Sequence, residues 1–217
     1  MAVGEIFLSI AAGLQVTFLI AFYALLFAVP FTFIFGVLQY LTRGPARFCV
    51  TGIIEFWRSS SAIVLLFVFF YVLPFIGIRF DPYTVGAMVL GLNMGGYGTQ
   101  VVRGALNAVD RGQLEAARSL GLTRLQALLT VELPQAFRQM LPTFVNELVE
   151  LIKLTALVSL ITLADPTFRA KQIFQLTYQP AAIYSSLLLV YFAVGYPIAL
   201  IGKRLERRFA KADLVPK

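Results

Sequence analysis

Residues 110–134 read DRGQLEAARSLGLTRLQALLTVELP and form a charged, amphipathic stretch in a chain that is otherwise largely apolar. Segments 110–113 and 123–126 each match a capping box, in which a side chain at each end satisfies free backbone N–H groups. Gly121 lies where a residue in the left-handed conformation ends a helix. The stretch therefore predicts a compact helix–turn–helix within about residues 108–134. The alternative is an amphipathic loop on a membrane surface.

The sequence on either side of this stretch is typical of membrane-spanning helices. Of the 217 residues, 59% are hydrophobic and 13% are charged, whereas about 25% are charged in a soluble domain. A span requires about 20 consecutive apolar residues. We therefore expect an all-α integral membrane protein with about five transmembrane helices. The expected spans are residues 6–41, 48–76, 83–106, 141–164 and 183–201.

Local features distinguish three of these spans. Pro30 is expected to kink the first. The second is interrupted by Glu55, Arg58 and the triplet Ser59–Ser61, which indicates a helix broken at membrane depth. The third is rich in glycine, and small residues allow helices to pack closely.

The distribution of charge predicts the orientation and excludes several functions. Most basic residues of the chain, whose net charge is +7, fall on the side of the 108–134 stretch and of the C-terminal tail. The positive-inside rule then places the N-terminus outside and the C-terminus in the cytoplasm. Histidine is absent and Cys49 is the single cysteine, so we expect no metal site, no cofactor and no catalytic site, and no nucleic-acid partner.

The motif Glu115-Ala116-Ala117, followed after three residues by Gly121 and later by Leu133-Pro134, resembles the signature loop of permease subunits of ATP-binding-cassette (ABC) importers. The resemblance extends from about residue 10 to 209, and segments 103–106 and 150–162 resemble the subgroup that takes up polar amino acids. It implies one permease domain over residues 1–217 with the type I importer permease fold. The residues that would contact the ATPase are Glu115, Ala116, Ala117, Gly121, Leu133 and Pro134.

The same resemblance implies the partners and the location. These are a second permease subunit, identical or related, two cytoplasmic ATPase subunits and an extracytoplasmic solute-binding protein, assembled in the lipid bilayer of a bacterial inner membrane. The chain has no Gly-x-x-x-x-Gly-Lys phosphate loop. ATP hydrolysis is therefore expected from the separate ATPase, and this chain is expected to be a transport subunit without enzymatic activity.

Charged residues inside the fourth span are candidates for the solute pathway. Asn146, Glu150 and Lys153 share one helical face and Glu147 lies beside them, and charges at this depth usually have a function. Asn93 in the third span is a weaker candidate. The alternatives are a structural Glu150–Lys153 ion pair and an interhelical hydrogen bond from Asn93.

Two details bear on the solute. Residues 153–157 read KLTAL, where many permeases for polar amino acids have KDTSL. Residues 156–165, 167–170 and 72–74 resemble permeases of ectoine and hydroxyectoine importers, so we expect ectoine or hydroxyectoine, with a polar amino acid as the alternative. An ion-coupled secondary transporter is a further alternative, because intramembrane Glu and Lys suit ion coupling.

Overall fold

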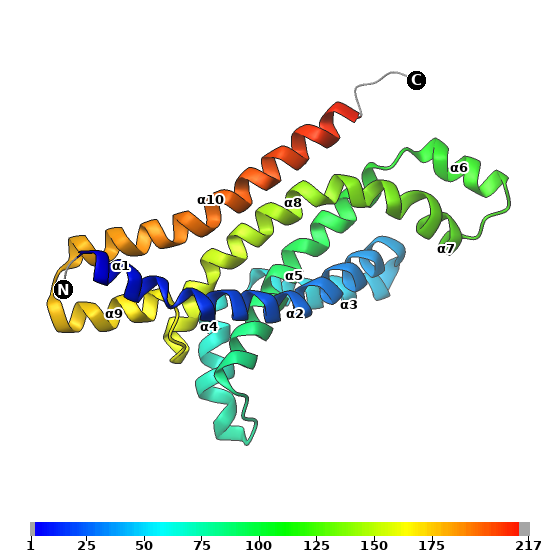
Figure 1. Cartoon of the computed structure of the whole chain (residues 1–217). Helices are drawn as coiled ribbons and strands as arrows, with labels where there is room; N and C mark the ends of the chain where they lie inside the picture. Colours follow the sequence, from blue (N-terminus) through cyan, green and yellow to red (C-terminus); the bar gives the residue numbers. More distant parts are fainter. Residues whose placement is uncertain (1–2, 213–217) are drawn as a thin grey trace.

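The computed structural model describes residues 3–212, with side chains for residues 3–207, and this part of the chain contains helices and no strand (Figure 1). The all-α prediction is confirmed. The α-helices are α1 (Val3–Ala11), α2 (Leu14–Leu41), α3 (Gly44–Ser59), α4 (Ala62–Phe67), α5 (Pro82–Ala108), α6 (Arg111–Ser119), α7 (Arg124–Ala127), α8 (Leu133–Leu154), α9 (Pro166–Thr177) and α10 (Pro180–Ala212). Short π-helical segments are η1 (Val68–Val72) and η3 (Leu128–Glu132), and short 3-10 segments are η2 (Leu73–Ile76) and η4 (Thr155–Ile161).

The first span differs from its prediction around Gly13, which lies between the end of α1 at Ala11 and the start of α2 at Leu14. The backbone of Asp165 and Pro166 approaches Gly13 so closely that a Cβ atom there would overlap it. The break therefore lies where the chain leading into α9 crosses the first span. α2 continues through Pro30 without a break in its helix.

The interruption predicted in the second span is confirmed. The helix stops after Ser59, and the axes of segments Gly44–Ser59 and Ala62–Ile76 differ by 91°. The second half continues through η1 and η2 and ends at Gly77, whose φ of +87° is left-handed.

The centre of the molecule is the contact between α2 and α5. A Cβ atom on Gly91 would overlap the carbonyl oxygen of Ala24. The hydroxyl of Thr32 donates a 3.2 Å hydrogen bond to the carbonyl oxygen of Gly95. The glycines thus let the two backbones approach closely, as predicted. The surrounding core includes Ile20, Leu66, Val89, Leu90 and Leu151.

The last two spans differ from their predicted bounds. α8 begins earlier than predicted, at Leu133, so the 108–134 stretch runs directly into it, and it ends at Leu154, where η4 follows. α10 is longer than predicted and continues past residue 201 into the basic tail. α9, which was not predicted, lies between them. Its N-terminus is capped by the Asp165 carboxylate, which accepts hydrogen bonds from the N–H groups of Thr167 (3.2 Å) and Phe168 (2.9 Å).

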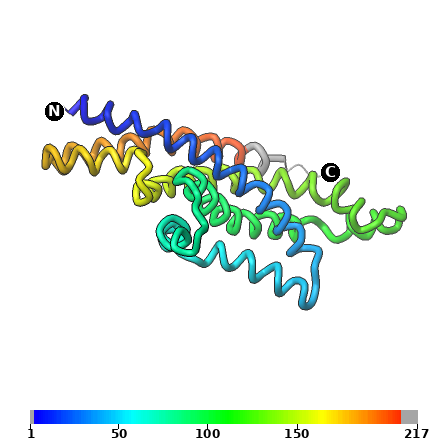
Figure 2. Tube along the Cα trace, turned by 90° about the horizontal axis from the view of Figure 1, so that it is seen from below, coloured from blue at the N-terminus to red at the C-terminus, as the bar shows by residue number. Residues whose placement is uncertain are grey.

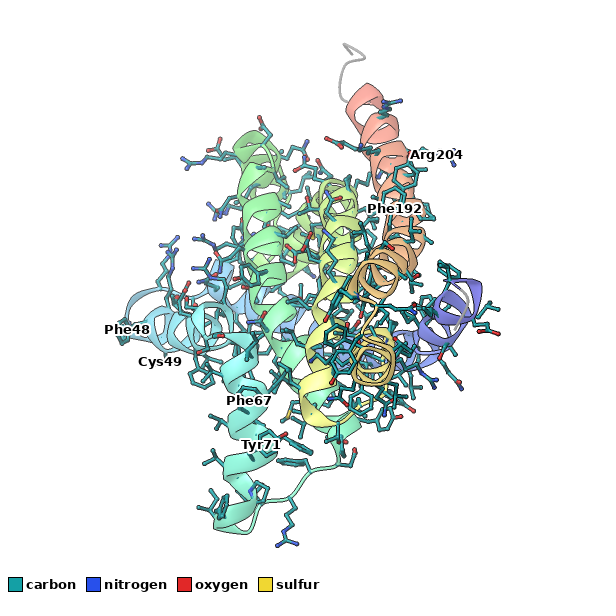
Figure 3. All side chains as sticks on the ribbon, turned by 90° about the vertical axis from the view of Figure 1, so that its left-hand side faces the viewer. Phe48, Cys49, Phe67, Tyr71, Phe192 and Arg204 are labelled. Atoms are coloured by element: carbon teal, nitrogen blue, oxygen red, sulfur yellow. The ribbon has the colours of Figure 1, made fainter. Side chains whose placement is uncertain are left out.

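In the part of the chain that the structure describes, five successive units correspond to the predicted spans: α1 with α2, α3 with α4, α5, α8 and α10. By length and hydropathy alone, Val3–Leu41 and Pro180–Arg207 could span a membrane, as could the bent pair 44–76 taken as one span. α5 and α8 fall short of this hydropathy criterion, because α5 is rich in glycine and α8 carries charged residues. Exposed aromatic side chains such as Phe48 and Phe192 point away from the bundle (Figure 3).

The helices also have two distinct ends. The connection between α2 and α3, the helices α6 and α7 and the C-terminal end of α10 lie toward one end, which we call the basic end (Figure 1). α1, α9 and the start of α10 lie toward the other. Figure 2 shows the segment around α6 and α7 projecting beyond the remaining helices.

Candidate functional site

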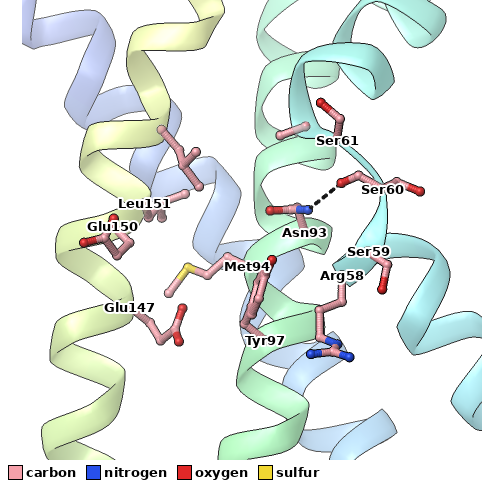
Figure 4. A pocket seen from close by; sticks show the side chains of 12 residues that line it. Arg58, Ser59, Ser60, Ser61, Asn93, Met94, Tyr97, Glu147, Glu150 and Leu151 are labelled. Atoms are coloured by element: carbon pink, nitrogen blue, oxygen red, sulfur yellow. Dashed lines mark hydrogen bonds between the residues drawn. The ribbon is translucent and has the colours of Figure 1, made fainter.

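A cavity of about 530 Å³ lies between α8 and the break that separates α3 from α4 (Figure 4). α5 forms its floor with Asn93, Met94 and Tyr97. Its remaining lining consists of Arg58, Ser59, Ser60, Ser61, Ala62, Glu147, Glu150, Leu151 and Leu154. The cavity therefore combines carboxylates, a guanidinium group, hydroxyl groups and apolar side chains.

The α8 wall carries two of the predicted pathway residues, Glu147 and Glu150. Glu147 is partly buried and, among the described residues, has no hydrogen bond or ion pair. Glu150 accepts a 2.6 Å hydrogen bond from Nζ of Lys153, and both side chains are more than half exposed. The Glu150–Lys153 pair, which was the structural alternative from the sequence, is therefore present. Glu147 is the acid of this wall without a partner among the described residues.

Two predicted pathway residues do not line the cavity. Lys153 lies beyond its lining although it is paired with Glu150. Asn146 is turned toward α10, where its side-chain oxygen lies near Gly202. The i, i+4, i+7 pattern is present on α8, but only part of that face borders the cavity.

The opposite wall carries a base that the sequence marked as part of the helix break. Arg58 forms an ion pair of 2.7 Å with Glu55, and its guanidinium group lies 6.0 Å from the centre of the Tyr97 ring. Its Nε atom is buried and has no hydrogen-bond partner within the part of the chain that the structure describes. Arg58 and the three serines that follow it also line the cavity. The sequence feature that could have identified these residues as cavity residues is the predicted break in the helix at this point.

Asn93 stabilises that break. Its amide nitrogen donates hydrogen bonds to the carbonyl oxygens of Trp57 (2.7 Å) and Ser60 (3.5 Å), and Figure 4 shows the second of these bonds. These carbonyl groups lie at the end of α3, where helical partners are missing. Asn93 thus makes the contact expected of a structural residue and at the same time borders the cavity.

The 108–134 stretch folds as two short helices, α6 and α7, as predicted. Gly121 separates them with a left-handed φ of +79°, and the capping box of Thr123 and Gln126 is complete. Asp110 caps α6 through the N–H of Gly112. The other predicted capping box is not formed, because the side-chain oxygen of Gln113 accepts a hydrogen bond from Gln135 instead.

The outer surface of this segment offers leucines and, besides the capping residue Asp110, the acid Glu115. Glu115 is exposed and its carboxylate has no partner among the described residues, whereas Ala116 is exposed and Ala117 is buried. Leu133 is partly buried, and Pro134 is exposed in the first turn of α8. The large exposed apolar residues here are Leu120, Leu125 and Leu129.

An ion pair fixes the base of the segment. Glu132 is only 2% exposed, and its carboxylate pairs with the guanidinium group of Arg124. Burial alone would lower the pKa of Arg124, but the hydrogen bond and the negative charge of Glu132 outweigh this effect and raise it. Arg124 is therefore charged whenever the protein is folded, and the pair holds α7 against the start of α8.

Comparison with known proteins agrees with this architecture. Residues 28–211 match the model of the family described as binding-protein-dependent transport system inner membrane components. A probable amino-acid ABC transporter permease of Sinorhizobium fredii is 37% identical over 204 residues, which cover 89% of this chain and 84% of that protein. A probable glutamine ABC transporter permease of Bacillus subtilis is 31% identical over 199 residues, 90% of this chain and 91% of that protein.

Solved structures show the same fold. The crystal structure of an amino acid ABC transporter with histidines superimposes with a TM-score of 0.80 at 30% identity, over 94% of both chains. An inward-facing structure of a methionine ABC transporter superimposes with a TM-score of 0.70 at 23% identity, over 93% of this chain and 94% of that one. The type I importer permease fold predicted from the signature loop is therefore confirmed, and the chain belongs to the family of inner membrane components of binding-protein-dependent transport systems.

Proposed function

We propose that this chain is the permease subunit of an ABC importer for a polar amino acid and that the cavity between α8 and the break after α3 is its solute pathway. The observation that carries the proposal is the pair of opposed walls, with Glu147 and Glu150 on α8 and Arg58 across the cavity.

The charges suit a zwitterion. Glu147, which has no partner among the described residues, is free to accept hydrogen bonds from an ammonium group. Arg58 can donate hydrogen bonds to a carboxylate of the solute while it keeps its ion pair with Glu55, because a guanidinium group has five donor N–H bonds. An uncompensated carboxylate that is partly buried is unfavourable, so a cationic group of the solute would relieve that penalty. The base of the pathway is then Arg58 and not Lys153.

Residues 108–134 would form the coupling segment to a separate ATPase. Glu115 is free for a basic partner, Ala116 permits close approach, and the exposed leucines supply apolar area. Gly121, Leu133 and Pro134 set the turn and the entry into α8, so a push on α6 would be transmitted along a continuous helix to Glu147. We propose that the basic end lies in the cytoplasm and the N-terminus outside, as the positive-inside rule predicts.

The polar amino acid is preferred over ectoine because the relatives are named as permeases for amino acids, glutamine and L-cystine among them. Ectoine, also a compact zwitterion, stays a prediction from the resemblance of residues 156–170. Ion-coupled transport is disfavoured by the family, which is named for its dependence on binding proteins.

The test is ATP hydrolysis in proteoliposomes that contain the chain with its partner permease, ATPase and binding protein. We expect stimulation by a polar amino acid such as glutamine, arginine or cystine, and loss of amino acid uptake in Glu147→Gln. Stimulation of ATP hydrolysis by ectoine alone would mean that the solute is ectoine and not a polar amino acid. ATP hydrolysis that no solute stimulates would contradict the proposal.

A further inference from the structure

A second cavity, of about 540 Å³, lies at the basic end and differs in character from the solute pathway. It is formed where the end of α2, the start of α3, the end of α5 and the helices α6 and α7 meet. Five arginines line it: Arg43, Arg47, Arg103, Arg118 and Arg124. Among the described residues, the lining of this cavity contains no carboxylate.

The positive charge of this cavity is largely uncompensated. Among the described residues, Arg124 alone of the five forms an ion pair, with Glu132. Arg103 donates through Nη2 to the side-chain oxygen of Gln100 (2.9 Å), and its Nε atom is buried without a hydrogen-bond partner. A buried donor without a partner is costly, and a bound anion would satisfy it.

The positive-inside rule explains an excess of arginine at this end. It does not explain why five arginine side chains line one cavity. The five side chains come from segments that lie up to eighty-one positions apart, from Arg43 to Arg124 (124 − 43 = 81), and they line a single cavity. Orientation in the membrane requires only the charges, anywhere in the loops. A shared cavity that includes a partly buried guanidinium group is the arrangement of a binding site.

The position of the cavity indicates which anion it takes. Arg43 and Arg47 flank the start of α3, and the next residue, Phe48, is 82% exposed and points away from the bundle (Figure 3). Ile53 and Phe56 are further exposed apolar side chains of the same helix. The cavity thus adjoins a surface suited to acyl chains, and guanidinium groups bind phosphate with paired N–H donors.

We propose that the arginine-lined cavity binds the phosphate group of an anionic phospholipid. Basic pockets between membrane helices on the cytoplasmic side have this chemistry. The bound headgroup would join α2, α3 and α5 to the α6–α7 segment. The proposal goes beyond the transport function and is independent of the solute.

The experiment measures lipid binding by the purified full-length chain in detergent, by native mass spectrometry with phosphatidylglycerol and with phosphatidylcholine as the neutral probe. We expect preferential retention of phosphatidylglycerol. Arg103→Gln should weaken it about fivefold, and Arg43→Gln with Arg103→Gln about twenty-five-fold, since each basic residue near a membrane surface contributes about 1 kcal/mol. Arg103→Lys, which keeps the positive charge, should weaken the retention of phosphatidylglycerol less than Arg103→Gln does.

The matched control is Arg138→Gln, an exposed arginine of α8 that does not line the cavity. It should leave lipid retention unchanged, and unchanged unfolding temperatures would show that the variants fold. Equal loss in the control, or no loss in Arg103→Gln, would overturn the proposal. Competition by free inorganic phosphate as strong as by the lipid would overturn the lipid as the source. Loss of ATPase binding with unchanged lipid retention would assign the cavity to an acidic protein surface instead.

Discussion

The hydroxyl group of Tyr40 donates a 2.7 Å hydrogen bond to the carboxylate of Glu132, which lies ninety-two positions later in the chain. The same carboxylate pairs with Arg124, whose guanidinium group lies 5.1 Å from the centre of the Tyr40 ring. The end of the first span is thereby joined to the base of the α6–α7 segment. A movement of that segment would act on α2 as well as on α8.

The first prediction concerns this junction. Tyr40→Phe removes one hydrogen bond to a buried carboxylate and should lower the free energy of unfolding by about 1 kcal/mol. Glu132→Ala also leaves Arg124 without its partner and should lower it by about 2–3 kcal/mol. Thermal unfolding in detergent measures both. The control is Tyr71→Phe, which loses a hydrogen bond to a backbone carbonyl far from the segment. It shows how much stability the loss of any tyrosine hydroxyl costs, apart from the loss of this junction.

If the junction carries coupling, Tyr40→Phe should also reduce the number of solute molecules taken up per ATP hydrolysed. Tyr71→Phe should leave that ratio unchanged. A ratio that is the same in the wild type and in Tyr40→Phe would restrict Tyr40 and Glu132 to a structural role.

The second prediction uses the conformation of Gly121. A Cβ atom at this position would meet no other atom within 4 Å, so Gly121→Ala would be opposed only by the left-handed backbone. That strain is about 1–2 kcal/mol. We expect a weaker association with the ATPase, measured by co-purification, because the angle between α6 and α7 would change.

Gly104→Ala is the matched control. Gly104 is also free of neighbours within 4 Å, but it lies within the helix α5, without a positive φ. Alanine favours a helix by about 1 kcal/mol over glycine, so this variant should be at least as stable as the wild type. It should also co-purify with the ATPase subunit as the wild type does. Equal effects of the two substitutions would show that the turn is unimportant.

The third prediction distinguishes two neighbouring residues of α8. Glu147→Gln should reduce uptake at least tenfold, because an unpaired acid of the cavity wall loses its charge. Asn146→Ala, one position away and turned toward Gly202, should retain most of the uptake. Uptake assays in proteoliposomes with equal amounts of assembled complex compare them. Equal uptake by Glu147→Gln and the wild type would place the solute elsewhere.

The fourth prediction concerns pH. Asp165 is fully buried beyond the end of η4, and burial raises its pKa although Phe168, Tyr191 and Thr167 donate hydrogen bonds to it. The folded state therefore holds its proton more tightly than the unfolded chain. This contribution to stability is present at low pH and is lost as the pH rises from about 4, the ordinary pKa of aspartate, through the raised pKa.

Asp165→Asn should keep the cap of α9. Its unfolding temperature should fall less than that of the wild type as the pH rises through this range. Asp165→Ala should flatten it too but lose about 1 kcal/mol at all pH values, because the cap is removed. A pH profile of Asp165→Asn that is identical to the wild type would show that Asp165 does not titrate in this range.

The features that the sequence predicted are those with local causes. The break after Ser59 follows from polar residues inside an apolar run, and the turn at Gly121 follows from helix-capping patterns. α9 was not predicted, because its stability depends on a buried cap at Asp165 and on packing against α1 and α10. The choice between Arg58 and Lys153 as the base of the cavity also depends on how α3 and α8 approach each other, which spacing along one helix does not determine.

The most direct measurement of the central claim is uptake of radiolabelled glutamine or arginine into proteoliposomes that contain the chain with its partner subunits. The ATPase faces the lumen, and ATP is trapped inside or omitted. We predict uptake that requires both ATP and the binding protein and that is lost in Glu115→Arg, which reverses the exposed charge of α6. Uptake that follows an imposed ion gradient without ATP, and that Glu115→Arg leaves unchanged, would contradict the account.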